Sequence, residues 1–234
     1  MDEAGVKTFA IGDIHGAYKA LIQCFERSGF DRENDRLIVL GDVCDGYLEV
    51  RQCIDELLKV RNCDLVIGNH DLWALDWALK GIKEEIWLNQ GGVDTIKSYA
   101  GSAMPQAHID LLKGAGSYLV LNDKVFVHGG FDPGKPITGQ DKNNFVWDRT
   151  LIDYARQIDS INPDYQLSDF KEIYVGHTPT VKFGSAVPLK LCNVWDMDTA
   201  AGWGGKLSIM NVETKEYWQS DLTRELYPQS EPRR

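Results

Sequence analysis

The sequence predicts an α/β fold, because short apolar segments alternate with amphipathic segments in the first part of the chain. Residues 7–11 and 36–40 are typical of buried strands, and residues 65–67 form a third, shorter segment of this kind. Residues 18–28 and 48–60 carry apolar side chains at helical spacing. Strands that are separated by helices usually pair in parallel, so we expect the sheet to begin as a parallel one.

The middle of the chain, residues 72–113, is predicted to be a helical insertion. It contains three tryptophans and two helical patterns, which are interrupted around the sequence NQGG at 89–92. Pro105 is well placed to begin the later helix. After this region the strand pattern returns in five segments rich in β-branched and aromatic residues: YLVL, KVFVHGG, EIYVGHT, CNVWDMD and KLSIMNV.

Composition limits the classes of function. The chain has 234 residues, 43% of them hydrophobic, and we expect one domain over residues 1–234. Its formal net charge of −10 argues against nucleic-acid polymers and anionic membranes as partners. The sequence has no apolar stretch near the roughly 18 residues of a membrane span and no recognisable signal peptide, so a cytoplasmic location is expected. Its five cysteines are interpreted as reduced thiols.

Five short polar fragments stand at the ends of apolar segments. They are GDIHG at 12–16, GDVCDG at 41–46, GNHD at 68–71, VHGG at 127–130 and GHT at 176–178. These fragments contain four of the five histidines of the chain. A single Asp, Asn or His beside glycine is more often a turn or cap residue than a ligand. Five of them at strand ends, where loops open at one edge of a sheet, together predict a dinuclear metal site.

The residue types indicate how such a site is built. Asp13 and His15 are two residues apart, so both side chains can face one ion, and Asp42 can bridge this ion to a second. The second ion would be completed by Asn69, His128 and His177. This mixture of carboxylate, amide and imidazole ligands suits two divalent ions, with manganese expected first and iron, zinc or nickel as alternatives.

The fragments resemble the signature GDxHG, GDxxDRG and GNHE of the calcineurin-like metallophosphoesterases, within them the phosphoprotein phosphatase branch. The resemblance spans roughly residues 7–210. It implies a four-layer α/β fold with a central β-sandwich flanked by helices. It also implies hydrolysis of a phosphoester by a hydroxide shared between two metal ions. In this scheme His70 is the general acid for the leaving group, and Asp45 orients it.

Further motifs narrow the branch but leave the substrate open. The last histidine loop reads GHTP rather than the GHxH of the nucleases, and WLNQGGVDTIKSY at 87–99 is similar to a segment of bacterial and phage members. The resemblance therefore implies a serine/threonine protein phosphatase acting on a phosphoprotein. Symmetrical hydrolysis of diadenosine tetraphosphate, or of another small phosphoester, is the alternative. A non-catalytic phosphate-binding scaffold is a further one.

One departure from the family pattern concerns the phosphate. Where the family has an arginine that clamps it, this chain has Gly46 followed by Tyr47. Loss of a guanidinium fork weakens phosphate binding or changes which substrates are accepted. Arg149, in the sequence VWDR, matches a second arginine of the bacterial members and is expected to bind phosphate together with Asn69. The alternative for Arg149 is a surface ion pair with Asp148 or Asp153.

Other polar and aromatic residues receive structural interpretations. His108 lies in the helix predicted after Pro105 and is expected to face solvent. Asp71 replaces the Glu of GNHE and is expected either to support its loop or to pair with His70. Core packing is the expected role of Trp73, Trp77 and Trp87, and the alternative is that they line a groove that receives a peptide or a nucleobase.

Overall fold

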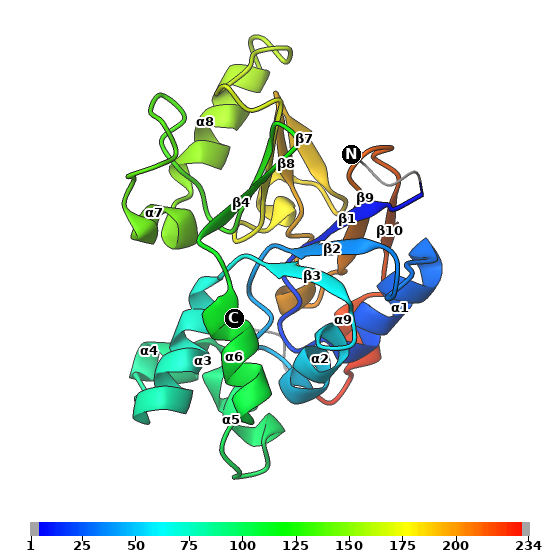
Figure 1. Ribbon diagram of the computed structural model, residues 1–234, viewed down its shortest axis with the longest axis vertical. Helices are drawn as coiled ribbons and strands as arrows, with labels where there is room; N and C mark the ends of the chain where they lie inside the picture. Colours follow the sequence, from blue (N-terminus) through cyan, green and yellow to red (C-terminus); the bar gives the residue numbers. More distant parts are fainter. Residues whose placement is uncertain (1–4, 231–234) are drawn as a thin grey trace.

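The computed structural model describes residues 5–230 and places two five-stranded sheets face to face (Figure 1). The first sheet has the order β10-β9-β1-β2-β3, in which β1, β2 and β3 are parallel and β9 and β10 are antiparallel to their neighbours. The predicted parallel start of the sheet is therefore confirmed. Its strands are β1 (Thr8–Ile11), β2 (Arg36–Val39), β3 (Asn62–Leu65), β9 (Ser208–Asn211) and β10 (Tyr217–Gln219).

The second sheet repeats this plan with a parallel centre and antiparallel edges. Its order is β4-β5-β6-β8-β7, with β5, β6 and β8 parallel and with β4 and β7 antiparallel to their neighbours. Its strands are β4 (Tyr118–Leu121), β5 (Lys124–Val127), β6 (Glu172–Val175), β7 (Leu189–Leu191) and β8 (Val194–Asp196). The carboxyl ends of parallel strands in both sheets are thus available to build one site.

Alternation along the strands divides the core into layers. Phe9 and Ile11 of β1 pack toward the helices, whereas Ala10 packs toward the other sheet. In the second sheet Phe126 and Tyr174 face the first sheet and stack with their ring centroids 4.8 Å apart. The structure therefore has the predicted four layers, with helices outside a central β-sandwich.

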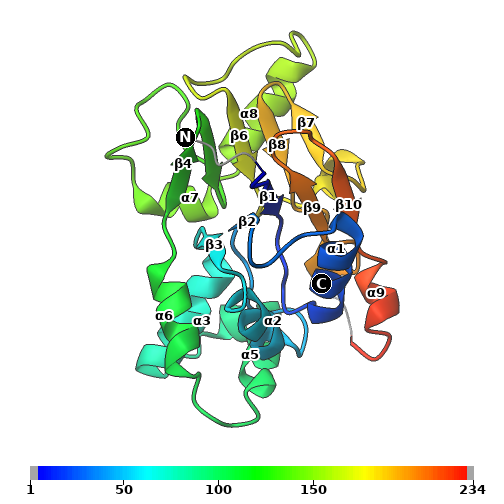
Figure 2. The same ribbon diagram turned by 45° about the vertical axis from the view of Figure 1, so that its right-hand side comes forward.

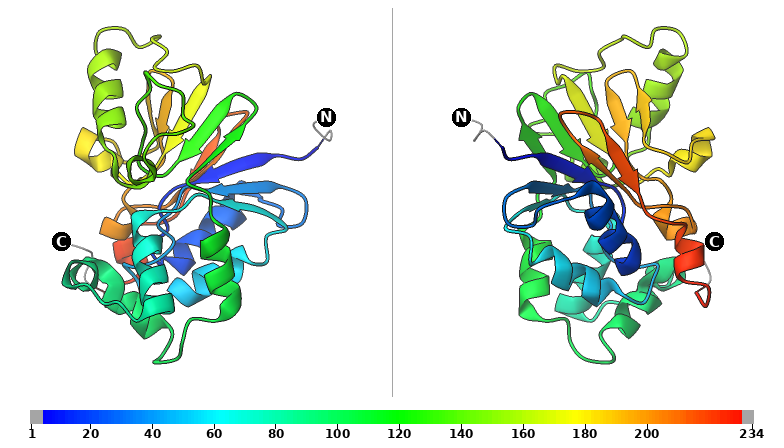
Figure 3. Two further views of the ribbon diagram at one scale, coloured as in Figure 1. Left: turned by 60° about the vertical axis from the view of Figure 1, so that its left-hand side comes forward. Right: turned by 90° about the vertical axis from the view of Figure 1, so that its right-hand side faces the viewer.

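Two groups of helices cover the outer faces, as Figures 2 and 3 show. The helices α7 and α8 lie beside the second sheet and contribute to its own core. The other helices lie against the first sheet. The bounds are α1 (Tyr18–Ser28), α2 (Val50–Leu57), α3 (Asn69–Lys80), α4 (Glu85–Trp87), α5 (Val93–Ser98), α6 (Gln106–Gly114), α7 (Lys142–Trp147), α8 (Thr150–Asp159) and α9 (Thr223–Leu226).

The region predicted as a helical insertion is helical and is interrupted where NQGG predicted a break. Between α4 and α5 the chain forms an irregular turn, Leu88–Gly92, in which Gly91 has a φ of 101°. Such a backbone conformation favours glycine, which has no Cβ. Pro105 is the residue before α6, as the sequence predicted. The insertion begins earlier than expected, because α3 starts at Asn69, directly inside the GNHD fragment.

Two boundaries differ from the sequence prediction, and several elements were not predicted. The third strand is Asn62–Leu65 rather than residues 65–67, because β3 is an edge strand, where polar residues are favoured and an apolar pattern is weak. Helix α2 is shorter than the predicted segment 48–60. The helices α7, α8 and α9 and the edge strands β7 and β10 were not predicted. No helix within residues 5–230 is both long and apolar enough to cross a membrane.

Candidate dinuclear metal centre and adjoining acid

The five polar fragments meet at the carboxyl ends of strands from both sheets. The fragments after β1, β2 and β3 come from the first sheet, and those after β5 and β6 come from the second. Each of the predicted ligands is at most 6% exposed: Asp13, His15, Asp42, Asn69, His128 and His177. The structure therefore brings together all six side chains that the sequence singled out as ligands.

Two overlapping groups of ligand atoms have the spacing of metal sites. One group contains Asp13, His15 and Asp42, and the other contains Asp42, His128 and His177; within each, the atoms lie within 4.8 Å of one another. Asp42 is common to both, with Oδ2 3.6 Å from His15 Nε2 and Oδ1 3.4 Å from His128 Nε2. Asn69 joins the second group, because its Oδ1 lies 3.1 Å from His128 Nε2.

Backbone carbonyls orient two of the histidines. His128 Nδ1 lies 2.7 Å from the carbonyl oxygen of Leu40, and His15 Nδ1 lies 3.1 Å from that of Cys44. A carbonyl oxygen only accepts, so each Nδ1 carries the proton and donates it. The Nε2 atom of each ring faces Asp42, and in the neutral form of the ring it would be available as a ligand atom, which is the arrangement that metal-binding histidines adopt.

Several residues of the centre have a strained backbone. His15, Asp42, Asp45 and His177 have φ values of 49°, 50°, 71° and 67°, in the left-handed region that residues other than glycine seldom adopt. Each such residue costs of the order of 1–3 kcal/mol and persists only where its surroundings enforce it. Strain at four polar residues in one place is typical of a functional site.

The electrostatics of the centre fit cation binding. Burial, together with the charges of Asp198 and Asp42, raises the pKa of Asp13 well above its usual value. Burial, aided by the charge of His128, lowers the pKa of His177 to about 2, so this ring is neutral. Its Nε2 is buried and has no hydrogen-bond partner among residues 5–230. A cation would neutralise the crowded carboxylates and bind this nitrogen, so the residues fit the divalent ions that the sequence predicts.

The predicted acid pair stands beside the ligands. His70 Nδ1 lies 2.6 Å from Oδ2 of Asp45, and His70 Nε2 lies 4.0 Å from Oδ2 of Asp42. Asp45 is completely buried, so its only contacts are with protein groups. Because one ring nitrogen is held by a carboxylate, the other is directed toward the centre. Trp87 and Thr95 also contact Asp45, and the sequence interpretation missed both contacts.

Asp71 supports the loop, which is one of its two predicted roles. Its carboxylate accepts hydrogen bonds from the backbone N–H groups of Val43, Cys44 and Gly68. Burial is the main cause that raises the pKa of Asp71 to about 6, and the charge of Asp42 is the second. The side chain therefore fixes the loop after β2 against the beginning of α3. Cys44, in this loop, is fully buried, as its packing role requires.

Arg149 and Gly46 are the two positions at which phosphate binding is expected to differ from the family pattern. Arg149 is exposed, follows α7 and forms no ion pair with Asp148 or Asp153. Its charge contributes to the lowered pKa of His177, after burial and His128, which places it near the centre. Gly46 has a φ of 90°, and a Cβ there would lie 3.0 Å from the Cβ and the carbonyl oxygen of His15.

The prediction that His108 faces solvent is wrong. The residue is 2% exposed, with Nδ1 3.0 Å from the hydroxyl of Tyr99 and Nε2 2.9 Å from Oδ1 of Asp55. It therefore joins α6 to α2 and α5. The signal was the spacing of His108 and Leu112, four residues apart on one face of the helix, because Leu112 is a core residue.

Sequence reasoning also missed an acid and one of the two residues of an aromatic wall; for the other, Trp73, lining a groove was the alternative to core packing. Asp198 is buried and raises the pKa of Asp13; its signal was its position just after β8, like the other polar fragments. The wall consists of Trp73, partly buried, and Trp147, 40% exposed, whose ring centroids are 5.1 Å apart. Trp73 contacts the ring of His70, and Trp147 lies against that of His177. Trp77 and Trp87 pack in the core as predicted.

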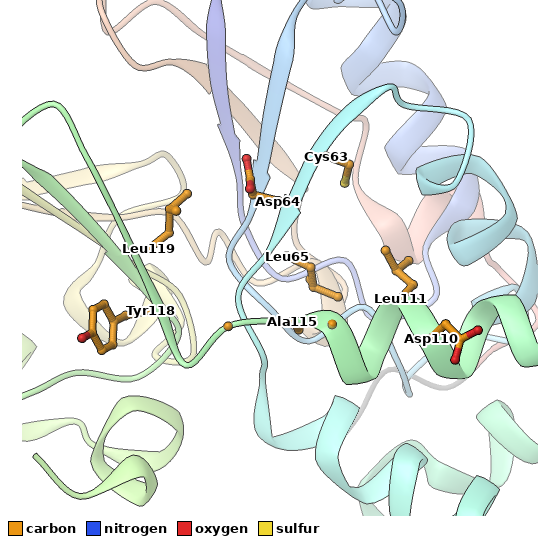
Figure 4. A pocket seen from close by; sticks show the side chains of 10 residues that line it. Cys63, Asp64, Leu65, Asp110, Leu111, Ala115, Tyr118 and Leu119 are labelled. Atoms are coloured by element: carbon orange, nitrogen blue, oxygen red, sulfur yellow. The ribbon is translucent and has the colours of Figure 1, made fainter. Parts of the chain in front are cut away.

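A hollow elsewhere on the surface is not part of this centre. It lies where α6 leads into β4, and its lining includes Cys63, Leu111 and Tyr118 (Figure 4). None of the predicted ligand, acid or phosphate-binding residues lines it. This hollow therefore adds no residue to the candidate site at the strand ends.

Comparison with known proteins identifies the class to which this fold and site belong. A model of the calcineurin-like phosphoesterase family matches residues 6–202, and the chain belongs to this family. The resemblance inferred from the polar fragments is thereby confirmed. The chain is a phosphoester hydrolase, and membership implies divalent metal ions, for which the two ligand groups are the candidates.

Individual relatives carry more specific names. The chain is 25% identical over 213 residues to serine/threonine-protein phosphatase 1 of Salmonella typhimurium, covering 88% of this chain and 91% of the relative. It is 26% identical over 268 aligned positions to a symmetrical bis(5'-nucleosyl)-tetraphosphatase of Methylobacillus flagellatus, covering 91% and 94%. A metallophosphoesterase structure from Sphaerobacter thermophilus superposes with a TM-score of 0.59 at 17% identity, covering 96% and 94%, which supports the fold alone.

Proposed function

We propose that the chain is a metal-dependent serine/threonine protein phosphatase. The observation that carries the proposal is the pair of ligand groups sharing Asp42, placed directly beside the His70–Asp45 pair. One arrangement thus combines candidate cation ligands with a proton donor, as hydrolysis of a phosphomonoester requires. The similarity to a serine/threonine-protein phosphatase along most of both chains supports this substrate class.

The ligands divide between two ions, with manganese proposed first and iron, zinc or nickel as alternatives. Asp13, His15 and Asp42 would hold one ion. Asp42, Asn69, His128 and His177 would hold the other. When bound, two such ions polarise the phosphoryl group and make water a stronger nucleophile at neutral pH.

His70 would protonate the departing oxygen of the substrate. Its Nδ1 donates to Asp45, which fixes the ring, and its Nε2 faces the centre and would hold the proton to be transferred. Protonation is needed most for alkoxides, because serine and threonine are poor leaving groups. Asp45 has the separate role of keeping the imidazole in this orientation.

Phosphate oxygens would be bound by Asn69 and Arg149. A guanidinium donates two parallel hydrogen bonds to a phosphate, and Arg149 is exposed, unengaged with its acidic neighbours and near His177. At Gly46, by contrast, there is no side chain to contribute. We therefore expect Arg149 to carry a larger share of phosphate binding here than it would beside a second arginine.

Symmetrical hydrolysis of diadenosine tetraphosphate is a second candidate function. The aromatic wall of Trp73 and Trp147 favours it, because the wall is partly exposed and adjoins both His70 and His177. An indole face next to a phosphate site is suited to stacking an adenine. The similarity to symmetrical tetraphosphatases is in keeping with this alternative.

A hydrolysis panel separates these functions. Metal-free protein would be supplied with Mn, Fe, Zn, Ni or Mg and offered phosphopeptides, diadenosine tetraphosphate and small phosphate esters. We expect the highest kcat/KM for phosphoserine or phosphothreonine peptides with Mn, and loss of turnover with a chelator. A higher kcat/KM for the dinucleotide would overturn the protein phosphatase proposal in favour of the second candidate.

Two variants test the site itself. Asp13→Asn should abolish turnover of an activated aryl phosphate, because it removes a charged ligand. If wild-type protein with Mn and this variant are equally inactive, the proposed phosphatase activity loses its basis and the non-catalytic alternative is favoured. His70→Asn should reduce turnover of alkyl phosphates far more than that of activated aryl phosphates. Equal losses for both would show that His70 is not the acid.

A further inference from the structure

The carboxylate of Asp45 accepts hydrogen bonds from other side chains in addition to the histidine that it orients. His70 Nδ1 lies 2.6 Å from Oδ2. The indole Nε1 of Trp87 donates to both oxygens, at 2.8 Å to Oδ2 and 3.0 Å to Oδ1. The hydroxyl of Thr95 donates to Oδ1 at 2.5 Å. Three side chains therefore converge on a carboxylate that has no contact with solvent.

The direction of the Thr95 hydrogen bond is fixed by the backbone. The amide N–H of Asp45 donates to Thr95 Oγ1 at 2.9 Å, so the hydroxyl accepts this bond and its own proton is left for the carboxylate. Trp87 Nε1 is a donor only. Both groups thus donate hydrogen bonds to the carboxylate of Asp45, which also accepts the hydrogen bond from His70 Nδ1.

These contacts also fix the plane of the carboxylate. Trp87 spans the two oxygens and Thr95 binds the one that His70 does not use, so rotation about the Cβ–Cγ bond would break at least one bond. A buried carboxylate that loses such partners is costly to maintain, and it turns toward whatever donor remains. The direction in which Asp45 holds the ring of His70 therefore depends on Trp87 and Thr95.

The chain segment that supplies these donors is shaped for the purpose. Trp87 ends α4 and Thr95 lies in α5, on either side of the irregular turn Leu88–Gly92. A Cβ at Gly91 would lie 2.5 Å from the backbone nitrogen of Gly46, next to Asp45. A Cβ at Gly92 would lie 2.4 Å from the indole of Trp87. The two glycines allow the turn to approach the loop closely enough for both donors to reach one carboxylate.

We propose that Trp87 and Thr95 are positioning residues for the proton donor, acting through Asp45. Segment 87–95 then helps to orient the proton donor of the hydrolytic site in addition to packing in the core. The inference rests on the proposed role of His70 and extends it to two residues whose side chains reach His70 through Asp45.

The test compares leaving groups. Thr95→Val removes the hydroxyl at nearly constant volume, and Trp87→Phe removes the N–H donor but keeps an aromatic ring. For each variant, kcat would be measured with a phosphoserine peptide and with an activated aryl phosphate under saturating Mn. We expect a loss of about 10–100-fold with the peptide, as for other orienting partners of site residues, and a loss of no more than about threefold with the aryl ester, which needs no acid.

Matched controls separate positioning from packing. Thr95→Ser keeps the hydroxyl, so turnover of the peptide should recover to within about threefold of wild type. Trp77→Phe alters a neighbouring tryptophan of the same core, and it should not change the ratio of the two substrates. If Trp87→Phe fails to fold, the comparison of Thr95→Val with Thr95→Ser decides the question.

The outcomes distinguish this inference from the proposed function. In a His70→Asn background, Thr95→Val should produce no further loss that is specific to the peptide, because residues that act through one another are not additive. Equal losses for both substrates in Thr95→Val, with His70→Asn still selective for the peptide, would overturn the positioning role and leave the acid in place. A His70→Asn variant without such selectivity would overturn the acid and the inference together.

Discussion

Replacing Gly68 by alanine should destroy the metal centre by direct contact with Asp42. Gly68 has φ −98° and ψ 168°, an extended conformation that alanine adopts without strain. A Cβ at this position would lie 2.1 Å from Oδ1 of Asp42 and 2.4 Å from its backbone nitrogen. The effect of Gly68→Ala is therefore one of space alone, with no contribution from the backbone preference of glycine.

The displacement can be compared with what a metal site tolerates. An ordinary contact begins at 3.4 Å, so Asp42 and the alanine must separate by 3.4 − 2.1 = 1.3 Å. Metal–ligand distances vary by only about 0.2 Å. Because Asp42 belongs to both candidate ligand groups, its displacement would affect both of the proposed ions. We expect loss of both ions and a fall in turnover of more than about 100-fold, since changes in orienting partners alone cost about 10–100-fold.

The assay combines metal content with activity. Protein loaded with Mn would be gel-filtered, its metal measured by elemental analysis and its turnover measured with an activated aryl phosphate. Gly114→Ala is the matched control, because a Cβ there has no atom within 4 Å. The control should retain its metal and turnover. If Gly68→Ala kept both ions and more than half of the wild-type turnover, Asp42 would not be the shared ligand.

Three further predictions concern stability and specificity. Burial raises the pKa of Glu56, but hydrogen bonds from Lys59 and Arg32 outweigh this effect and hold the pKa below 4.5. Glu56→Gln should therefore lower the free energy of unfolding by about 1–2 kcal/mol at pH 7. In urea unfolding this difference should disappear as the pH falls below 4.5, because a lowered folded-state pKa stabilises fully only above the unfolded value and its contribution is lost as the carboxylate is protonated. His108→Ala should cost about 1–3 kcal/mol in the same assay, through lost hydrogen bonds and packing, and should leave kcat unchanged. Trp147→Ala should raise KM for diadenosine tetraphosphate about tenfold, since base stacking contributes roughly 1–3 kcal/mol. A similar rise in KM for phosphate esters without an aromatic group would contradict stacking.

The sequence was most informative about residues whose position in space is determined by the end of a strand. The carboxyl ends of parallel strands meet at one edge of a sheet, so polar fragments after successive strands were predicted to converge. Asp13, which follows a strand of the same sheet as Asp42, and His128, which follows a strand of the other sheet, both lie close to Asp42. The edge strand β3 was placed incorrectly, because its residues are partly exposed and do not form an apolar segment.

Contacts made by single donors could not be predicted in the same way. The helical spacing around Trp87 predicts a buried indole and says nothing of where its N–H points, and its partner Asp45 is 42 residues away. Asp198 lies in a fragment that was interpreted only as a strand. In each case the side chain was expected in the interior or in a regular element, and its polar partner depends on tertiary packing.

The missing arginine and the helical insertion are two consequences of one loop geometry. Gly46 has a φ of 90° and lies against His15, so a side chain at this position would push on a candidate ligand. The turn at Gly91 packs on the backbone of Gly46, where a Cβ on Gly91 would lie 2.5 Å from the Gly46 nitrogen, and this close approach lets Trp87 reach Asp45. A loop without the arginine of the family pattern thus has close support for the proposed acid pair, and on the proposed function the binding of phosphate by protein cations falls to residues outside the loop.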